Sequence, residues 1–143
     1  MSKKLFIFPA LLLVASLLLV TSCKKDCSFK QSDYSGTYVV SEDCSNSAPA
    51  AYAIIATPGA SETEVLLVNV WDKFGAGVKA TIDCETITIA RQEPDGDSFF
   101  VEGSGFIDKK DGVTSITLSY TVTDESVSPI DTDECTGSVF IQQ

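Results

Sequence analysis

Cysteines are the most reactive side chains of this sequence, and there are five of them: Cys23, Cys27, Cys44, Cys84 and Cys135. A thiol can be acylated, paired in a disulfide or bound to a metal ion. In a secreted protein an odd number leaves one cysteine outside any set of pairs, so one of the five needs a separate role. The paired Cys-x-x-Cys spacing typical of zinc sites is absent. We therefore favour disulfides over a zinc site.

A second group of candidate side chains lies in the segment EPDGDS, residues 93–98. Glu93, Asp95 and Asp97 are close enough in sequence to bind calcium through their oxygens or to act as paired carboxylates. The same residue types are typical of a solvated turn, and no Asp-x-Asp-x-Asp-Gly loop is present. We therefore favour a solvated turn and expect no metal and no cofactor.

The composition argues against two broad classes of function. The sequence has no histidine, the commonest base near neutral pH, and no Gly-x-Ser-x-Gly motif. We therefore expect no catalytic residues and no enzyme. The formal net charge is −10, with 10 basic and 20 acidic residues and no basic stripe. A phosphate backbone would repel such a chain, so we expect no nucleic-acid partner.

The apolar run at residues 5–20 determines how Cys23 is interpreted. Two lysines precede the run, which is shorter than the roughly 20 apolar residues of a membrane-spanning helix and suits a secretory signal. Residues 20–23 follow with the sequence VTSC. This segment resembles the lipobox of bacterial lipoproteins, in which an aliphatic residue and two small residues precede the acceptor cysteine. The alternative is an ordinary signal peptide followed by a free cysteine.

The lipobox resemblance implies that Cys23 carries lipid and is the first residue of the mature protein, after removal of the signal at residues 1–22. Acyl chains contribute about 0.8 kcal/mol per buried methylene, so two or three of them anchor a domain stably. Residues 23–33 would form the lipidated tether and residues 34–143 a single domain. Lys24 stands where an aspartate would resemble an inner-membrane retention signal. We therefore expect the outer membrane, on either its periplasmic or its cell-surface face.

The mature part of the chain has the period of β-strands and no helical period. In residues 113–122, Ile116, Leu118 and Tyr120 share one face, and serine and threonine occupy the other. Similar segments lie at 36–43, 51–57, 64–71, 78–83, 85–91, 98–107 and 135–142, separated by turn-like residues. Eight short strands predict an all-β domain, an eight-stranded antiparallel up-and-down barrel, with a β-sandwich as the alternative.

Two resemblances refine this prediction. The segment DYSGTYVV, residues 33–40, resembles the Gly-x-Trp opening of lipocalin-type barrels, with Tyr38 at the tryptophan position. The basic residue that such barrels pack over this ring is missing, since no residue after Lys110 is basic. More broadly, Tyr-x-Gly-Thr-Tyr, Gly-x-Gly, Tyr-Thr-Val-x-Asp and the final cysteine resemble small lipoproteins of Bacteroidota. These resemblances imply architecture rather than activity.

Barrel topology selects a disulfide pairing. In an up-and-down meander, Cys44 follows the first strand and Cys135 begins the last, so both lie at the far end, where barrel closure makes these strands neighbours. Cys84 lies in the turn between the fourth and fifth strands at the opposite, near end, where Cys27 precedes the first strand. We therefore predict Cys44–Cys135 and Cys27–Cys84, each stabilising by roughly 2 to 4 kcal/mol.

The far end also contains the best candidates for ligand contact. Trp71 and Phe74, in the segment WDKFGAG, can form an aromatic lip over an opening. Alternatively both rings plug the barrel as ordinary core, because eight-stranded barrels can be filled by their own side chains.

Two function classes follow from these alternatives. The first is a membrane-anchored binding module for a small apolar or glycan ligand, to which Trp71, Phe74 and Tyr38 would contribute. The second is an interaction or inhibitor protein with a packed barrel that contacts another envelope protein through its loops. Both are non-enzymatic, and we expect a monomer in either case. An interior cavity would favour the first class and a filled barrel the second.

Overall fold

The structure, a computed structural model, describes residues 27–143. The predicted signal, Cys23 and the first tether residues lie outside this range. Within residues 27–143, no helix is long and apolar enough to cross a membrane.

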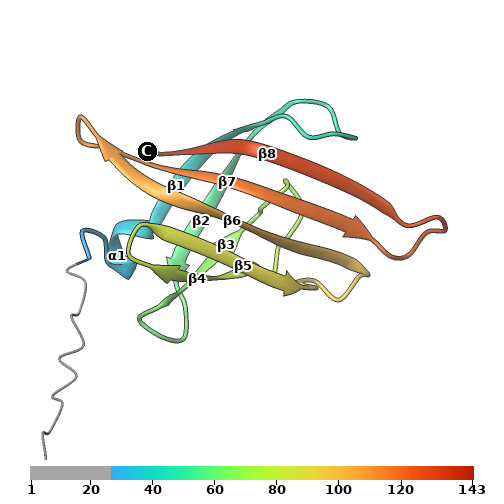
Figure 1. Ribbon diagram of the computed structural model, residues 1–143, viewed down its shortest axis with the longest axis horizontal. Helices are drawn as coiled ribbons and strands as arrows, with labels where there is room; N and C mark the ends of the chain where they lie inside the picture. Colours follow the sequence, from blue (N-terminus) through green and yellow to red (C-terminus); the bar gives the residue numbers. More distant parts are fainter. Residues whose placement is uncertain (1–26) are drawn as a thin grey trace, which may run out of the picture.

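Eight antiparallel strands close into an up-and-down barrel (Figure 1). Each strand pairs with the next, and β8 pairs with β1 through registers such as Tyr38 with Gln142. This arrangement confirms the predicted barrel over the sandwich. The strands are β1 (Gly36–Glu42), β2 (Ala50–Pro58), β3 (Glu64–Val68), β4 (Val78–Asp83), β5 (Thr86–Gln92), β6 (Phe99–Lys110), β7 (Val113–Asp124) and β8 (Asp131–Gln142).

Alternating burial along the strands builds the core. In β4 every second residue is buried, and in β7 the predicted face of Ile116, Leu118 and Tyr120 points inward. The alternation arises because successive side chains of a strand point to opposite faces. Large side chains fill the interior, and the largest fully buried ones include Tyr34, Tyr38, Phe74, Phe140, Ile54 and Leu67. Full burial of a large apolar side chain contributes roughly 1.5 to 3 kcal/mol.

The barrel has two ends of different character. The near end carries the connections 59–63, 84–85 and 111–112 together with the short helix α1 (Gln31–Tyr34). The far end carries the longer connections 43–49, 69–77, 93–98 and 125–130. In Figure 1, α1 and the β6–β7 turn lie on the left, and the β7–β8 connection lies at the extreme right.

Two predicted strand boundaries and one helix differ from the sequence-based expectation. The strand predicted at 64–71 ends at Val68, because Asn69, Trp71 and Asp72 have positive φ and turn the chain. The last strand begins at Asp131 rather than Cys135, since its backbone continues the ladder with β7 and the buried carboxylate of Asp133 finds hydrogen-bond partners there. Finally, α1 was not expected. A helix of one turn is too short to produce a detectable 3.6-residue period.

Gly105 allows β6 to lie close to β7. A Cβ atom at this position would overlap the carbonyl oxygen of Thr117 and lie 2.9 Å from a methyl group of Leu118. We expect Gly105→Ala to lower the free energy of unfolding by about 3 kcal/mol, at the upper end of the usual cost of overpacking. Urea denaturation would measure this loss. The control is Gly75→Ala, where the nearest atom is 4.0 Å from the new Cβ, and equal stability of the two variants would contradict the steric argument.

Candidate functional site

The near end is closed by its own side chains. The predicted disulfide Cys27–Cys84 is present, with its Cα atoms 4.8 Å apart. The hydroxyl of Tyr34 donates to the carbonyl oxygen of Cys84 at 2.8 Å, and the hydroxyl of Tyr38 donates to the carbonyl oxygen of Tyr34 at 2.9 Å. Gln31 donates through Nε2 to one carbonyl oxygen in the β2–β3 connection and to another at the start of β3. These contacts hold the N-terminal segment across the barrel opening.

Tyr38 therefore belongs to the near end and to the core. Its side chain is fully buried, and burial raises the pKa of its hydroxyl to about 12. Its hydrogen bond runs to α1, whereas Trp71 and Phe74 lie in the β3–β4 connection at the far end. The structure thus does not bring the three predicted ligand-binding residues together.

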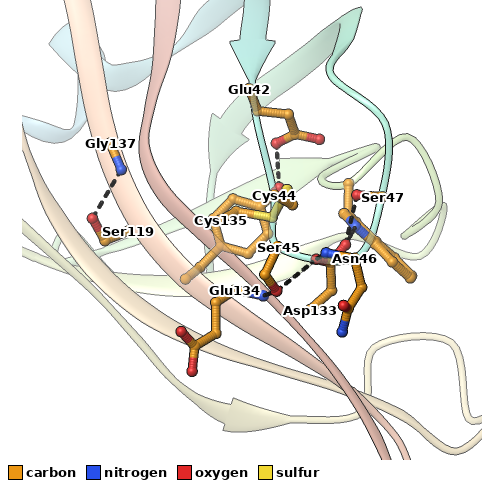
Figure 2. Close-up of a disulfide and its surroundings, with 12 residues drawn as sticks. Glu42, Cys44, Ser45, Asn46, Ser47, Ser119, Asp133, Glu134, Cys135 and Gly137 are labelled. Carbon is orange, nitrogen blue, oxygen red and sulfur yellow. Dashed lines mark hydrogen bonds between the residues drawn. A yellow bond between two sulfur atoms is a disulfide. The ribbon is translucent and has the colours of Figure 1, made fainter.

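The far end is closed by the second predicted disulfide, Cys44–Cys135 (Figure 2), whose Cα atoms are 4.1 Å apart. Next to it the backbone N–H of Ser45 donates to the carbonyl oxygen of Glu134 at 2.9 Å. In return the N–H of Glu134 donates to the hydroxyl of Ser45 at 2.9 Å. Both predicted disulfides are confirmed, and the second attaches the β1–β2 connection to β8.

Asp133 organises the polar contacts around this disulfide. Its carboxylate accepts from the backbone N–H of Asn46 at 2.8 Å, the hydroxyl of Ser47 at 2.6 Å and the indole N–H of Trp71 at 3.1 Å. Burial alone would raise the pKa of this carboxyl, but the hydrogen bonds outweigh it and lower the pKa. This role of Asp133 is not visible in the sequence, because the residue lies in a segment of similar acidic residues.

Trp71 and Phe74 have different environments. Phe74 is fully buried, whereas Trp71 is half-buried at the rim. The indole ring lies 6.3 Å from the ring of Phe74 and 5.9 Å from the ring of Phe99, measured between centroids. The backbone N–H of Trp71 also donates to the hydroxyl of Tyr52 at 2.8 Å. Trp71 is therefore held firmly while part of its surface reaches solvent.

A cleft of about 100 Å³ lies beside Trp71. We call it the rim cleft. It lies between the β1–β2 connection and the facing ends of β7 and β8, and the residues that line it include Trp71, Phe99, Asn46, Asp124, Asp131 and Asp133. Aromatic surface therefore meets carboxylates at one point of the far end.

The acidic segment 93–98 makes separate contacts with its surroundings. Asp95 accepts from the backbone N–H groups of Gly75 and Ala76, at 3.1 and 2.7 Å. Asp97 lies 3.1 Å from the ammonium of Lys73, whose hydrogen bond lowers the pKa of the Asp97 carboxyl. Glu93 accepts from the N–H of Ser98 at 2.5 Å. The three carboxylates thus have different partners, and they support the β3–β4 and β5–β6 connections.

Metal-ligand types converge in two places among residues 27–143. Cys27 and Cys84 lie close to Asp83, and Cys44 and Cys135 lie close to Glu42. The cysteines of both groups are joined in disulfides. In a disulfide the two sulfur atoms are bonded to each other, so these cysteines offer no thiolate to a metal ion.

Glu42 is a buried carboxyl next to the far-end disulfide (Figure 2). It accepts a short hydrogen bond from the hydroxyl of Tyr120, and Tyr52 is a further hydrogen-bonding neighbour. Burial raises the pKa of Glu42, and the two tyrosine hydroxyls oppose this effect only in part. Burial likewise raises the pKa of Tyr120. The charged form of Glu42 is therefore disfavoured by folding.

This burial gives a pH prediction. The pKa of Glu42 is higher in the folded chain than in the unfolded chain. Above the ordinary value of 4.5, the folded state therefore keeps a proton that the unfolded state has lost. We expect the free energy of unfolding to fall through that window, up to the raised pKa, and the Glu42→Gln variant to lack this part of the fall. Urea denaturation of both proteins between pH 4.5 and 8 measures the difference. Glu62→Gln, at an exposed carboxyl, is the control, and parallel curves for wild type and Glu42→Gln would contradict the prediction.

Comparison with known families and curated proteins gives no functional assignment for this chain. The sequence matches no family model. No curated protein matches it either.

Proposed function

We propose that this protein is an outer-membrane lipoprotein, anchored through Cys23, whose lipocalin-like barrel acts as a non-enzymatic interaction module. One observation favours an interaction module over a module that binds a small ligand inside the barrel. The interior is filled by core side chains, among them Tyr38, Phe74 and Phe140. A ligand inside the barrel would have to displace them, so recognition belongs on the outside.

The near-end disulfide supports an orientation for the anchored protein. The four-residue step from Cys23 to Cys27 spans at most roughly 14 Å. Cys27 is tied to Cys84 at the near end. A lipid on Cys23 would hold this end at the membrane, so the far-end connections would point away from it, toward partners.

The far end has the features of a contact surface. Trp71 lies half-buried at the rim, and tryptophan is among the residues that contribute most to protein interfaces. Val127 and Ile130, in the β7–β8 connection, are 45% and 59% exposed. Polar residues stand next to these apolar side chains in the sequence, as in the rim of a protein interface.

A second candidate is capture of a small apolar or glycan ligand, and the rim cleft is the observation that favours it. Trp71 lines it with aromatic surface, and carboxylates beside it can accept hydrogen bonds from hydroxyl groups. The volume of about 100 Å³ suits one small group rather than an extended ligand.

Site-specific photo-crosslinking in the host tests the interaction module. A photoreactive residue in place of Val127, at the far end, is expected to form a discrete protein adduct. The same residue in place of exposed Glu62, at the near end, is the matched control. Equal labelling from both ends, or no adduct from Val127, would argue against the proposal. Native mass spectrometry of the same preparation tests the second candidate, since a retained small molecule would favour ligand capture.

A further inference from the structure

We propose that the rim cleft receives an arginine side chain of the partner protein. This inference rests on the proposed interaction function and names the chemistry of its partner. Trp71 and Phe99 would contact the guanidinium face, and Asp124 and Asp131 would accept its hydrogen bonds.

Asp124 and Asp131 face each other directly across the end of the β7–β8 ladder. Like charges at such positions destabilise a sheet unless a cation joins them. Asp124 accepts hydrogen bonds from the backbone and side chain of Ser126, and Asp131 accepts from the amide of Asn46 and the N–H of Thr132. Within residues 27–143, neither carboxylate forms an ion pair. A partner's positive charge would relieve their repulsion.

The cations nearby already have partners. Lys73 pairs with Asp97, and Arg91 lies 2.5 Å from Glu125 and 3.5 Å from Glu102. Lys73 does not line the rim cleft, and within residues 27–143 neither cation forms an ion pair with Asp124 or Asp131. The whole chain has a net charge of −10, so a basic partner also gains from long-range attraction.

The aromatic rings favour a cation with a flat face. The rings of Trp71 and Phe99 are tilted by 42° with centroids 5.9 Å apart. The ammonium of Lys73 already lies 3.2 Å from the centroid of Phe99, so a ring in this region does bind a cation. A guanidinium adds planar stacking and several donors in a fixed fork, which an ammonium lacks.

The spacing of the carboxylates disfavours a metal ion. Both carboxylate oxygens of Asp133 already accept hydrogen bonds, from Asn46, Ser47 and Trp71. Asp124, Asp131 and Asp133 do not form a group whose oxygens lie within 4.8 Å of one another in the described part of the chain. A guanidinium can bridge more widely spaced acceptors, because its donors point in different directions.

The test uses Trp71, the single tryptophan of the chain, as a fluorescent reporter. The full-length protein in an uncharged detergent is titrated with a tetra-arginine peptide and with a tetra-citrulline peptide of matching shape and no charge. We expect a saturable change in fluorescence with arginine, weakened at least tenfold in Asp124→Asn/Asp131→Asn. Glu62→Gln/Asp111→Asn removes the same charge from the near end and is expected to bind like the wild type.

Several results would overturn the proposal. Equal weakening by the two double variants would indicate unspecific attraction to an acidic protein. An equal fluorescence response to the citrulline peptide would indicate that the positive charge is not recognised. A response to a neutral oligosaccharide and none to the arginine peptide would indicate a different ligand. A stronger response to calcium than to the arginine peptide would indicate a metal site. Urea denaturation verifies that both variants fold. If the arginine peptide does not bind but Val127 still forms far-end crosslinks, only the proposed arginine recognition is refuted. If the peptide binds but no crosslink forms, the proposed interaction function is refuted.

Discussion

Replacing Cys23 by serine is expected to move the protein from the membrane to the soluble fraction and to abolish incorporation of labelled palmitate. The serine hydroxyl cannot replace the thiol that would accept the lipid. The barrel should survive, because its four described cysteines are already paired with one another. Fractionation of cells, followed by detection of the protein in each fraction, measures the effect.

An uncleaved signal could hold this variant at the membrane, so a second variant serves as control. Residues 24–143 behind an ordinary secretory signal should give a soluble, β-rich protein without a free thiol. An unmodified Cys23 at the start of the wild-type protein, or wild-type protein that takes up no palmitate, would remove the basis for the anchor.

Loss of the far-end disulfide is expected to have the largest effect on stability. Cys44→Ser/Cys135→Ser opens a loop with a sequence separation of 91 residues, for which the chain-entropy estimate is roughly 4 to 5 kcal/mol. This is a large share of the roughly 5 to 15 kcal/mol that stabilises a typical domain. Guanidinium denaturation of the wild type and the variant gives the difference.

The near-end disulfide supplies the comparison. Cys27→Ser/Cys84→Ser opens a separation of 57 residues, for which the same estimate is roughly 4 kcal/mol. This variant keeps the hydrogen bonds of Tyr34 and Gln31 that hold α1 in place. We therefore expect it to unfold at a higher denaturant concentration than the far-end variant. A far-end loss below about 1 kcal/mol would show that the unfolded chain gains little freedom from the missing bond.

The fold could be predicted because its determinants are repeated along the chain. Alternation such as that of Ile116, Leu118 and Tyr120 recurs in eight segments, and a meander of eight strands brings Cys44 to Cys135 and Cys27 to Cys84. Each strand contributes the same signal, so an error of a few residues at one boundary does not change the topology.

The details of the far end could not be predicted in the same way. Asp133 differs from its acidic neighbours only in what the closed barrel places beside it, namely Asn46, Ser47 and Trp71. Glu42 ends a strand like many exposed glutamates, yet it lies against Tyr120 across the barrel. Such contacts join residues 62 to 87 positions apart, and local sequence patterns carry no information about them.

The disulfide between Cys27 and Cys84 also determines how the domain would respond to mechanical force. A pull on the chain before Cys27 passes through this bond into the β4–β5 turn instead of peeling α1 and β1 from the barrel. Strands in the middle of the chain then share the tension, and the N-terminal strand cannot unzip first. If the chain is pulled from its N-terminal side while the far end is held, the barrel would resist extension until it yields as a unit.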